Sequence, residues 1–271
     1  MTNYIRTEIV TISAEQSEIL IAALSESQFY AFEQEENSLL AYIKQEDFNE
    51  EKLKTLLPET VVYTYSVIED RNWNEEWESG FQPITVHNFV GIRASFHEPL
   101  KNVEHEIIIT PKMSFGTGHH ATTFLMIELM EKIDFKNKRV LDFGTGTGIL
   151  SILAEKLGAA SVKAIDCDEW SINNTSENIE ANQCGYIFPE KRNNITGITF
   201  IDIILANINF TVLLENAENL SVLLQPLSVL AISGILLQDE EAIISVFVKN
   251  GFVKKQMSQK EGWLALLFEK Q

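Results

Sequence analysis

Positive charge is scarce in this sequence. Its 271 residues include 21 lysines and arginines against 39 aspartates and glutamates, which gives a formal net charge of −18. Nucleic acid binding normally needs a basic surface, so the balance argues against stable binding of a phosphate backbone. Residues 1–70 hold 14 acidic and 4 basic side chains, so −10 of the charge lies there. We interpret this acidity as a solvated surface that would also tolerate a basic protein partner.

Cysteine and long apolar runs are also rare. Cys167 and Cys184 are the only two cysteines and lack C-x-x-C spacing, which excludes a disulfide framework. No apolar run approaches the roughly 20 residues that cross a bilayer, and residues 1–10 lack the basic and apolar segments of a signal peptide. We therefore expect a globular, cytoplasmic, monomeric protein that contacts no membrane.

The first 70 residues predict strands and helices in the order β-α-β-β-α-β. β-Branched and aromatic residues indicate the strands, and apolar residues at helical spacing indicate the helices. The expected bounds are strand Tyr4–Ile12, helix Ala14–Leu24 with Ser13 as N-cap, strands Phe29–Glu33 and Leu39–Lys44, helix Phe48–Leu57 and strand Val61–Ile68. This order is typical of a ferredoxin-like α+β domain, an antiparallel sheet with two helices on one face.

Residues 71–82 contain Trp73 and Trp77, four residues apart, and we interpret them as a linker helix. The second predicted domain, 83–271, opens with two extended stretches, Ile84–Phe96 and Glu106–Thr110. Helices are then predicted at 122–133, 149–157, 169–182, 210–223 and 238–249, and strands at 139–143, 161–165, 201–206, 227–233, 252–258 and 263–268. Alternation of this kind indicates a doubly wound, mostly parallel α/β sheet that ends in an antiparallel hairpin.

The clearest motif is R-V-L-D-F-G-T-G-T-G-I-L at residues 139–150, where Asp142 and three glycines, Gly144, Gly146 and Gly148, join a strand to a helix. Glycines at such a turn let the backbone approach a nucleotide-like ligand. The spacing G-x-G-x-G differs from the dinucleotide fingerprint G-x-G-x-x-G. An acid before the glycines would repel a pyrophosphate but could hold a cationic amino-acid group through water or backbone. The motif therefore favours S-adenosylmethionine over NAD.

Acids follow the next predicted strand, in A-I-D-C-D. Asp166, at the strand end, is placed to accept hydrogen bonds from ribose hydroxyls. Asp168 is expected to be the N-cap of the following helix. Cys167 is expected to pack.

The strand predicted at 201–206 leads into Asn207-Ile208-Asn209-Phe210. Either asparagine could cap the next helix, and we assign the cap to Asn209. The four residues match in spacing the Asn-Pro-Pro-aromatic loop of amino-methylating enzymes. There an amide oxygen accepts an amine N–H and an aromatic face tolerates positive charge, roles that we assign to Asn207 and Phe210.

The segment M-S-F-G-T-G-H-H-A-T-T at 113–123 has the composition of a loop that covers a ligand, although Thr122 could simply be an N-cap. His119 and His120 have no third ligand at helical spacing, so no metal is expected.

Together these segments resemble the PrmA methyltransferases, which modify bacterial ribosomal protein L11. The string F-G-T-G-H-H-A-T-T directly before a class I methyltransferase glycine loop is the most specific feature, and D-F-G-T-G-T-G, A-I-D and L-A-N-I extend the resemblance over nearly the whole chain. The resemblance implies S-adenosylmethionine-dependent methylation of lysine ε-amino groups and the α-amino group of that protein, with residues 1–70 recognising it. It also implies cofactor contacts at Thr123, Gly144, Asp166 and Asn207, and a covering loop of Phe115, Thr117, Gly118 and His119.

Residues 185–201 depart from the family pattern, because the stretch is short and lacks the Gly-Asp that usually ends the third strand. Adenine recognition is therefore not assigned. Two alternatives remain open: a class I methyltransferase for a nucleic-acid base or a small-molecule amine, and a cofactor-binding module without catalysis.

Overall fold

The computed structural model describes residues 4–10, 14–25, 27–29, 31–34, 38–58, 61–68, 81–110 and 116–271. The chain divides into two compact units, Met1–Gly80 and Phe81–Gln271. The expected Ser13 cap and residues 71–80 of the expected linker helix, with both tryptophans, lie outside the described residues. Residues 81–82, which are described, are not helical.

The first unit has the β-α-β-β-α-β order that its sequence predicts. Its elements are β1 (Tyr4–Val10), α1 (Ala14–Ser25), β2 (Ala31–Gln34), β3 (Ser38–Lys44), α2 (Glu50–Leu56) and β4 (Tyr63–Ile68). The strands form an antiparallel sheet in the order β2-β3-β1-β4. Both helices bury apolar side chains, such as Leu24 and Leu53, in one cluster with alternate residues of β1 and β3. Strand residues with a period of two share one face, so both helices cover the same face of the sheet.

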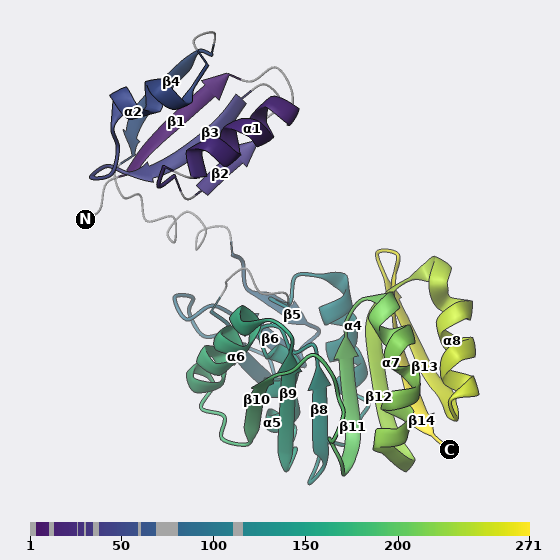
Figure 1. Ribbon diagram of the computed structural model, residues 1–271. Helices are drawn as coiled ribbons and strands as arrows, with labels where there is room; N and C mark the ends of the chain where they lie inside the picture. The colour runs from purple at the N-terminus through teal and green to yellow at the C-terminus, as the bar shows by residue number, and fades with distance from the viewer. Residues whose placement is uncertain are drawn as a thin grey trace. The chain divides into compact units, whose positions relative to one another are not determined.

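The second unit is built on a seven-stranded sheet in the order β10-β9-β8-β11-β12-β14-β13 (Figure 1). Its strands are β8 (Arg139–Phe143), β9 (Ser161–Asp166), β10 (Ile187–Lys191), β11 (Ile201–Asn207), β12 (Leu224–Leu236), β13 (Phe252–Lys260) and β14 (Trp263–Lys270). β14 is antiparallel to both of its neighbours, and the other pairs are parallel. The expected doubly wound sheet with a terminal hairpin is thus present.

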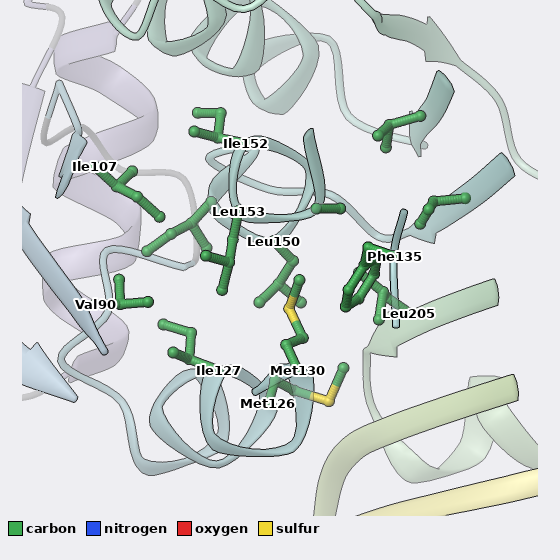
Figure 2. Packing of buried hydrophobic residues seen from close by; sticks show 14 of the residues in the cluster. Val90, Ile107, Met126, Ile127, Met130, Phe135, Leu150, Ile152, Leu153 and Leu205 are labelled. Carbon is green, nitrogen blue, oxygen red and sulfur yellow. The ribbon is translucent and has the colours of Figure 1, made fainter. Parts of the chain in front are cut away.

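Helices cover both faces of this sheet. They are α4 (Ala121–Met130), α5 (Ile149–Lys156), α6 (Glu169–Ala181), α7 (Phe210–Leu223) and α8 (Glu240–Lys249), the last preceded by a 3-10 turn, Leu237–Asp239. α4 and α5 pack into one apolar cluster, where Met126, Met130 and Leu150 converge (Figure 2). α7 and α8 pack into a second cluster with Phe247 and Phe252. Two separate clusters are what a sheet buried on both faces requires.

A small three-stranded sheet precedes the large one. It consists of β5 (Ile84–Val86), β6 (Val90–Arg93) and β7 (His105–Ile108) in that order. The single stretch expected at Ile84–Phe96 is therefore two strands with a turn at residues 87–89. β7 reaches the same apolar cluster as α4 and α5 through Ile107 (Figure 2).

The sequence prediction missed one strand. β10 lies at the edge of the large sheet and pairs only with β9 among the described strands. It contains Pro189, and three of its five residues are polar or proline, so it lacks the apolar run of a buried strand. An edge strand tolerates such residues because one side of its backbone makes no ladder hydrogen bonds. Within the described residues, no helix is long and apolar enough to cross a membrane.

Candidate active site

A cleft of about 720 Å³ lies at the carboxyl ends of β8, β9 and β11. The strand order turns back between β8 and β11, and such a point is where open α/β sheets bind ligands. Of the predicted site residues, Gly144, Gly146, Asp166 and Asn207 line the cleft. Segments far apart in the sequence are thus brought together by the parallel strands.

The glycine turn after β8 forms one wall. Gly144, Gly146 and Gly148 all have positive φ values, 79°, 56° and 82°, which a side chain would disfavour. A Cβ atom on Gly144 would overlap with Cγ2 of Ile208, which also lines the cleft. Gly148 is the N-cap of α5 and packs against Thr175 rather than lining the cleft. Glycine is therefore favoured at all three positions by the positive φ values of the turn, and at Gly144 and Gly148 also by close packing.

Asp166 links the turn to the end of β9. Its Oδ2 accepts a hydrogen bond from the N–H of Gly146 at 3.0 Å, and its Oδ1 accepts one from the N–H of Asp168 at 3.0 Å. Each carboxylate oxygen has a second lone pair, so the side chain can hold the loop and still accept from a ligand in the cleft. Asp168 is the N-cap of α6, as predicted, and accepts from the N–H of Trp170 at 3.1 Å.

Asp142 lies beneath the glycine turn and has no exposed surface. Its Oδ2 accepts hydrogen bonds from the hydroxyls of Thr145 at 2.7 Å and Ser151 at 2.6 Å, while Oδ1 has no partner among the described residues. Burial raises the pKa of this carboxyl to about 6, although the two hydroxyls oppose the shift. Asp142 does not line the cleft. In this structure it fixes the loop, and any contact with a ligand would be indirect.

Asn207 ends β11 at the floor of the cleft. Its Nδ2 donates to the hydroxyl of Thr123 at 3.4 Å, and its Oδ1 is buried without a partner among the described residues. Thr123 itself is fully buried in α4 and does not line the cleft. Thr123 therefore orients the amide and leaves its oxygen as the unused acceptor.

The residues after Asn207 separate into a cap and an aromatic. Asn209 caps α7, as predicted, by accepting from the N–H of Val212 at 3.0 Å. Phe210 does not line the cleft; it lines a smaller neighbouring pocket of about 450 Å³. Trp263, at the start of β14, lines both.

The loop before α4 contacts the start of the second unit. His119 bonds through Nε2 to the carbonyl of Gln82 at 3.0 Å and through Nδ1 to the Thr117 hydroxyl at 3.3 Å, and its ring packs edge-on against Phe81. Gly118 packs against β5 and β6. These residues support the loop without lining the cleft. Phe115 lies outside the described residues.

The histidine next to them was not predicted as a site residue. His120, not Thr122, is the N-cap of α4: its side chain accepts from the N–H of Thr122 at 3.2 Å. Its ring lies edge-on to Trp263, with centroids 4.9 Å apart, and it lines the cleft. Among the described residues, no group of three His, Cys, Asp or Glu could hold a metal ion.

Comparison with known proteins agrees with this geometry. A family model described as ribosomal protein L11 methyltransferase (PrmA) matches residues 3–271. The ribosomal protein L11 methyltransferase of Bacteroides fragilis is 39% identical over 261 residues, which cover 93% of each chain. That of Chlorobaculum parvum is 36% identical over 279 residues, covering 95% of this chain and 94% of the other. This chain belongs to the PrmA family.

A solved structure shows the same relationship. The ribosomal protein L11 methylase from Lactobacillus delbrueckii subsp. bulgaricus matches with a TM-score of 0.65 and 28% identity, covering 70% of this chain and all of that one. The predicted PrmA membership and the class I methyltransferase fold are confirmed. The protein is an S-adenosylmethionine-dependent methyltransferase, as the glycine spacing predicted.

Other cleft residues of this PrmA protein have no sequence signal of their own. Arg192 follows β10, Ile208 follows Asn207, and Trp263 stands at the turn of the terminal hairpin. Arg192 reaches the cleft because its backbone N–H donates to the backbone carbonyl of Asp166 at 2.8 Å, which continues the pairing of β10 with β9. Detecting it would have required the missed strand β10.

Proposed function

We propose that this PrmA protein transfers methyl groups to lysine ε-amino groups and the N-terminal α-amino group of ribosomal protein L11. The observation that carries the proposal is Asn207, whose buried Oδ1 is an unused acceptor at the switch point of the sheet. The curated relatives are named for methylation of ribosomal protein L11, which supports the substrate. Because ribosomal proteins are made in the cytoplasm, we place the reaction there.

The residues of the cleft fit S-adenosylmethionine. Gly144 and Gly146 offer backbone at the cleft wall without side chains, and Asp166 keeps acceptor capacity for hydroxyl groups. When bound, S-adenosylmethionine supplies a sulfonium methyl carbon that a neutral amine nitrogen can attack in line. We assign Gly144, Gly146, Asp166 and Asn207 to cofactor binding, with Thr123 acting through Asn207.

Asn207 also orients the amine. Its Oδ1 accepts an amine N–H, which directs the nitrogen lone pair away from Asn207 and into the cleft. Thr123 bonds to the Nδ2 end of the amide, which leaves Oδ1 for the amine; a flipped amide would instead point Nδ2, a donor, at the amine. Holding reactants in this way can lower a barrier by several kcal/mol, on the order of 7 or more in favourable geometries.

The amine must lose a proton before it attacks. A lysine side chain has an ordinary pKa near 10.4, and desolvation next to a cationic sulfonium favours its neutral form. Aromatic faces of Trp263 in the cleft and Phe210 beside it tolerate the positive charge that develops on nitrogen. We therefore expect the rate of methyl transfer to rise with pH until the bound amine is neutral.

The first unit supplies substrate recognition in this proposal. It holds all 14 acidic side chains of residues 1–70, against 4 basic ones in the same range, which suits a basic protein and disfavours naked RNA. We propose that the protein acts as a monomer and forms no stable complex with nucleic acid.

Methyl transfer to the two candidate acceptors tests the function. Purified protein is incubated with labelled S-adenosylmethionine and either free ribosomal protein L11 or naked ribosomal RNA, and Asn207→Ala and Asn209→Ala are compared. We expect label in the protein only, and a fall of at least tenfold in kcat for Asn207→Ala, because a lost hydrogen bond to a charged or reacting group costs about 1.5 to 3 kcal/mol. Asn209→Ala loses a helix cap but keeps the cleft acceptor. Label in RNA alone, or equal activity of both variants, would contradict the proposal.

A further inference from the structure

Three asparagines form a ladder along α6. Asn174, Asn178 and Asn182 are four residues apart and therefore share one face of the helix. Their amides bond to the backbone at the end of β7 rather than to other side chains. Asn182 accepts from the N–H of Ile108 at 2.9 Å and donates to its carbonyl, and Asn174 donates to the carbonyl of Thr110 at 3.2 Å. The asparagine side chains thus supply the backbone of residues 108–110 with hydrogen-bond partners that a neighbouring strand would otherwise provide.

Asn178 differs from the other two because it also reaches the glycine turn. It accepts from the N–H of Thr110 at 2.7 Å and donates through Nδ2 to the carbonyl of Thr147 at 2.8 Å. The side chain is fully buried, so water cannot replace either bond. One amide thus joins the end of β7 to the turn that lines the cleft.

The glycine turn depends on such external bonds for its shape. Gly146 and Gly148 have little intrinsic preference for one backbone conformation. On the α6 side, the Thr175 hydroxyl holds the Gly146 carbonyl at 2.9 Å, and Asn178 holds the next carbonyl, that of Thr147. On the other side, the Thr147 hydroxyl donates to the Gly116 carbonyl at 2.6 Å. The carbonyls of Gly146 and Thr147 are therefore oriented by side chains that do not line the cleft, whereas Asp166, which does, holds the Gly146 N–H.

We propose that Asn178 is a positioning residue for the methyl-transfer reaction. It fixes the turn for cofactor binding by tying the Thr147 carbonyl to β7, and Thr147 extends the link to Gly116. The proposal rests on the assignment of S-adenosylmethionine to the cleft. It adds a residue that touches neither cofactor nor substrate.

The ladder itself offers a matched control. Asn178→Asp keeps an acceptor for the Thr110 N–H but places a carboxylate oxygen against the Thr147 carbonyl, where a donor is required. Asn182→Asp makes the same chemical change at the end of the same helix. It loses the donor to the carbonyls of Ile108 and Asn178 but leaves the Asn178 side chain and the glycine turn unchanged. S-Adenosylhomocysteine binding is measured by calorimetry, the KM for S-adenosylmethionine by methylation, and the Tm of each free protein by thermal unfolding.

We expect Asn178→Asp to raise both the Kd for S-adenosylhomocysteine and the KM for S-adenosylmethionine by about tenfold or more. Asn182→Asp should lower the Tm but change neither the Kd nor the KM by more than about threefold. Equal constants for the two variants, whether both weak or both unchanged, would overturn the proposal. If Asn178→Asp does not fold, Thr147→Val and Thr147→Ser decide. Only Thr147→Ser keeps the hydroxyl that reaches Gly116. We therefore expect Thr147→Ser to retain most of the S-adenosylhomocysteine affinity that Thr147→Val loses. Equal affinity of the two variants would refute the link from Thr147 to Gly116.

The same measurements separate this inference from the proposed function. Wild-type protein that binds S-adenosylhomocysteine but does not methylate ribosomal protein L11 would refute the proposed substrate, while the difference in Kd between Asn178→Asp and Asn182→Asp would still support the positioning role. Wild-type protein that does not bind S-adenosylhomocysteine would overturn both.

Discussion

Replacing the buried carboxyl of Asp142 should change how stability depends on pH. The folded pKa of about 6 lies above the ordinary value of 3.8, so the folded state holds a proton more tightly than the unfolded state. Stability from this group is therefore complete below the unfolded pKa and is lost as pH rises through the folded pKa. At neutral pH, ionisation of this carboxyl lowers the free energy of unfolding by about 3 kcal/mol relative to a protein in which it stays protonated.

Asp142→Asn removes the titration while keeping the shape of the side chain. Thr145 and Ser151 donate to the carboxylate through hydroxyls, which can turn to accept from an amide instead. The free energy of unfolding of the variant, minus that of the wild type, should therefore increase with pH. The two pKa values give an increase of roughly 1 to 2 kcal/mol between pH 5 and pH 8, about half of the full effect.

Urea unfolding followed by circular dichroism at pH 5, 6, 7 and 8 measures this difference. Ser151→Ala is an informative second variant, because loss of a hydroxyl that lowers the Asp142 pKa should make the pH dependence steeper than in the wild type. A difference between Asp142→Asn and wild type that does not grow from pH 5 to pH 8 would refute the reasoning.

Three further changes test the site. Asp166→Ala should weaken S-adenosylhomocysteine binding by about 1 to 3 kcal/mol in calorimetry, because two backbone N–H groups lose their acceptor, and unchanged affinity would remove Asp166 from the site. Gly144→Ala should abolish S-adenosylhomocysteine binding, because the added Cβ displaces Ile208, and the double variant with Ile208→Ala should regain part of the affinity. If the double variant regains none, the clash with Ile208 is not the cause, and the positive φ of Gly144 accounts for the loss. A chain that starts at Phe81 should keep cofactor binding and lose methylation of ribosomal protein L11, whereas full activity would show that the first unit is not needed for recognition.

The sequence was most informative where a local signal determines the outcome. The order of elements in the first unit, and the alternation of strands and helices in the second apart from β10, follow from hydrophobic period. The caps at Asp168 and Asn209 follow from one residue before each helix. Gly144, Gly146 and Asp166 lie together at the cleft because the strand ends of a parallel sheet meet at one edge. These inferences need no knowledge of tertiary contacts.

The structure departs from the sequence interpretation where tertiary contacts decide. β10 was missed because its edge position, not its own composition, makes it a strand, and Arg192 was lost with it. His120, rather than the possible cap Thr122, is the N-cap of α4, and its ring also packs on Trp263, which lies more than 140 residues away in the sequence. Phe210 has the expected spacing from Asn207, but the start of α7 directs it to the neighbouring pocket. Spacing along the chain cannot reveal on which side of a turn a side chain lies.

The division of the chain explains why recognition and chemistry should be separable. The described residues that line the cleft all belong to Phe81–Gln271, and their supports, Thr123, Asp142 and Asn178, lie in the same unit. The first unit has its own apolar cluster, built from its own strands and helices, so its removal takes no residue from the clusters on either face of the large sheet. A unit with a separate core can be lost without collapse of the other. Loss of substrate methylation with retained cofactor binding would then report on recognition rather than on stability.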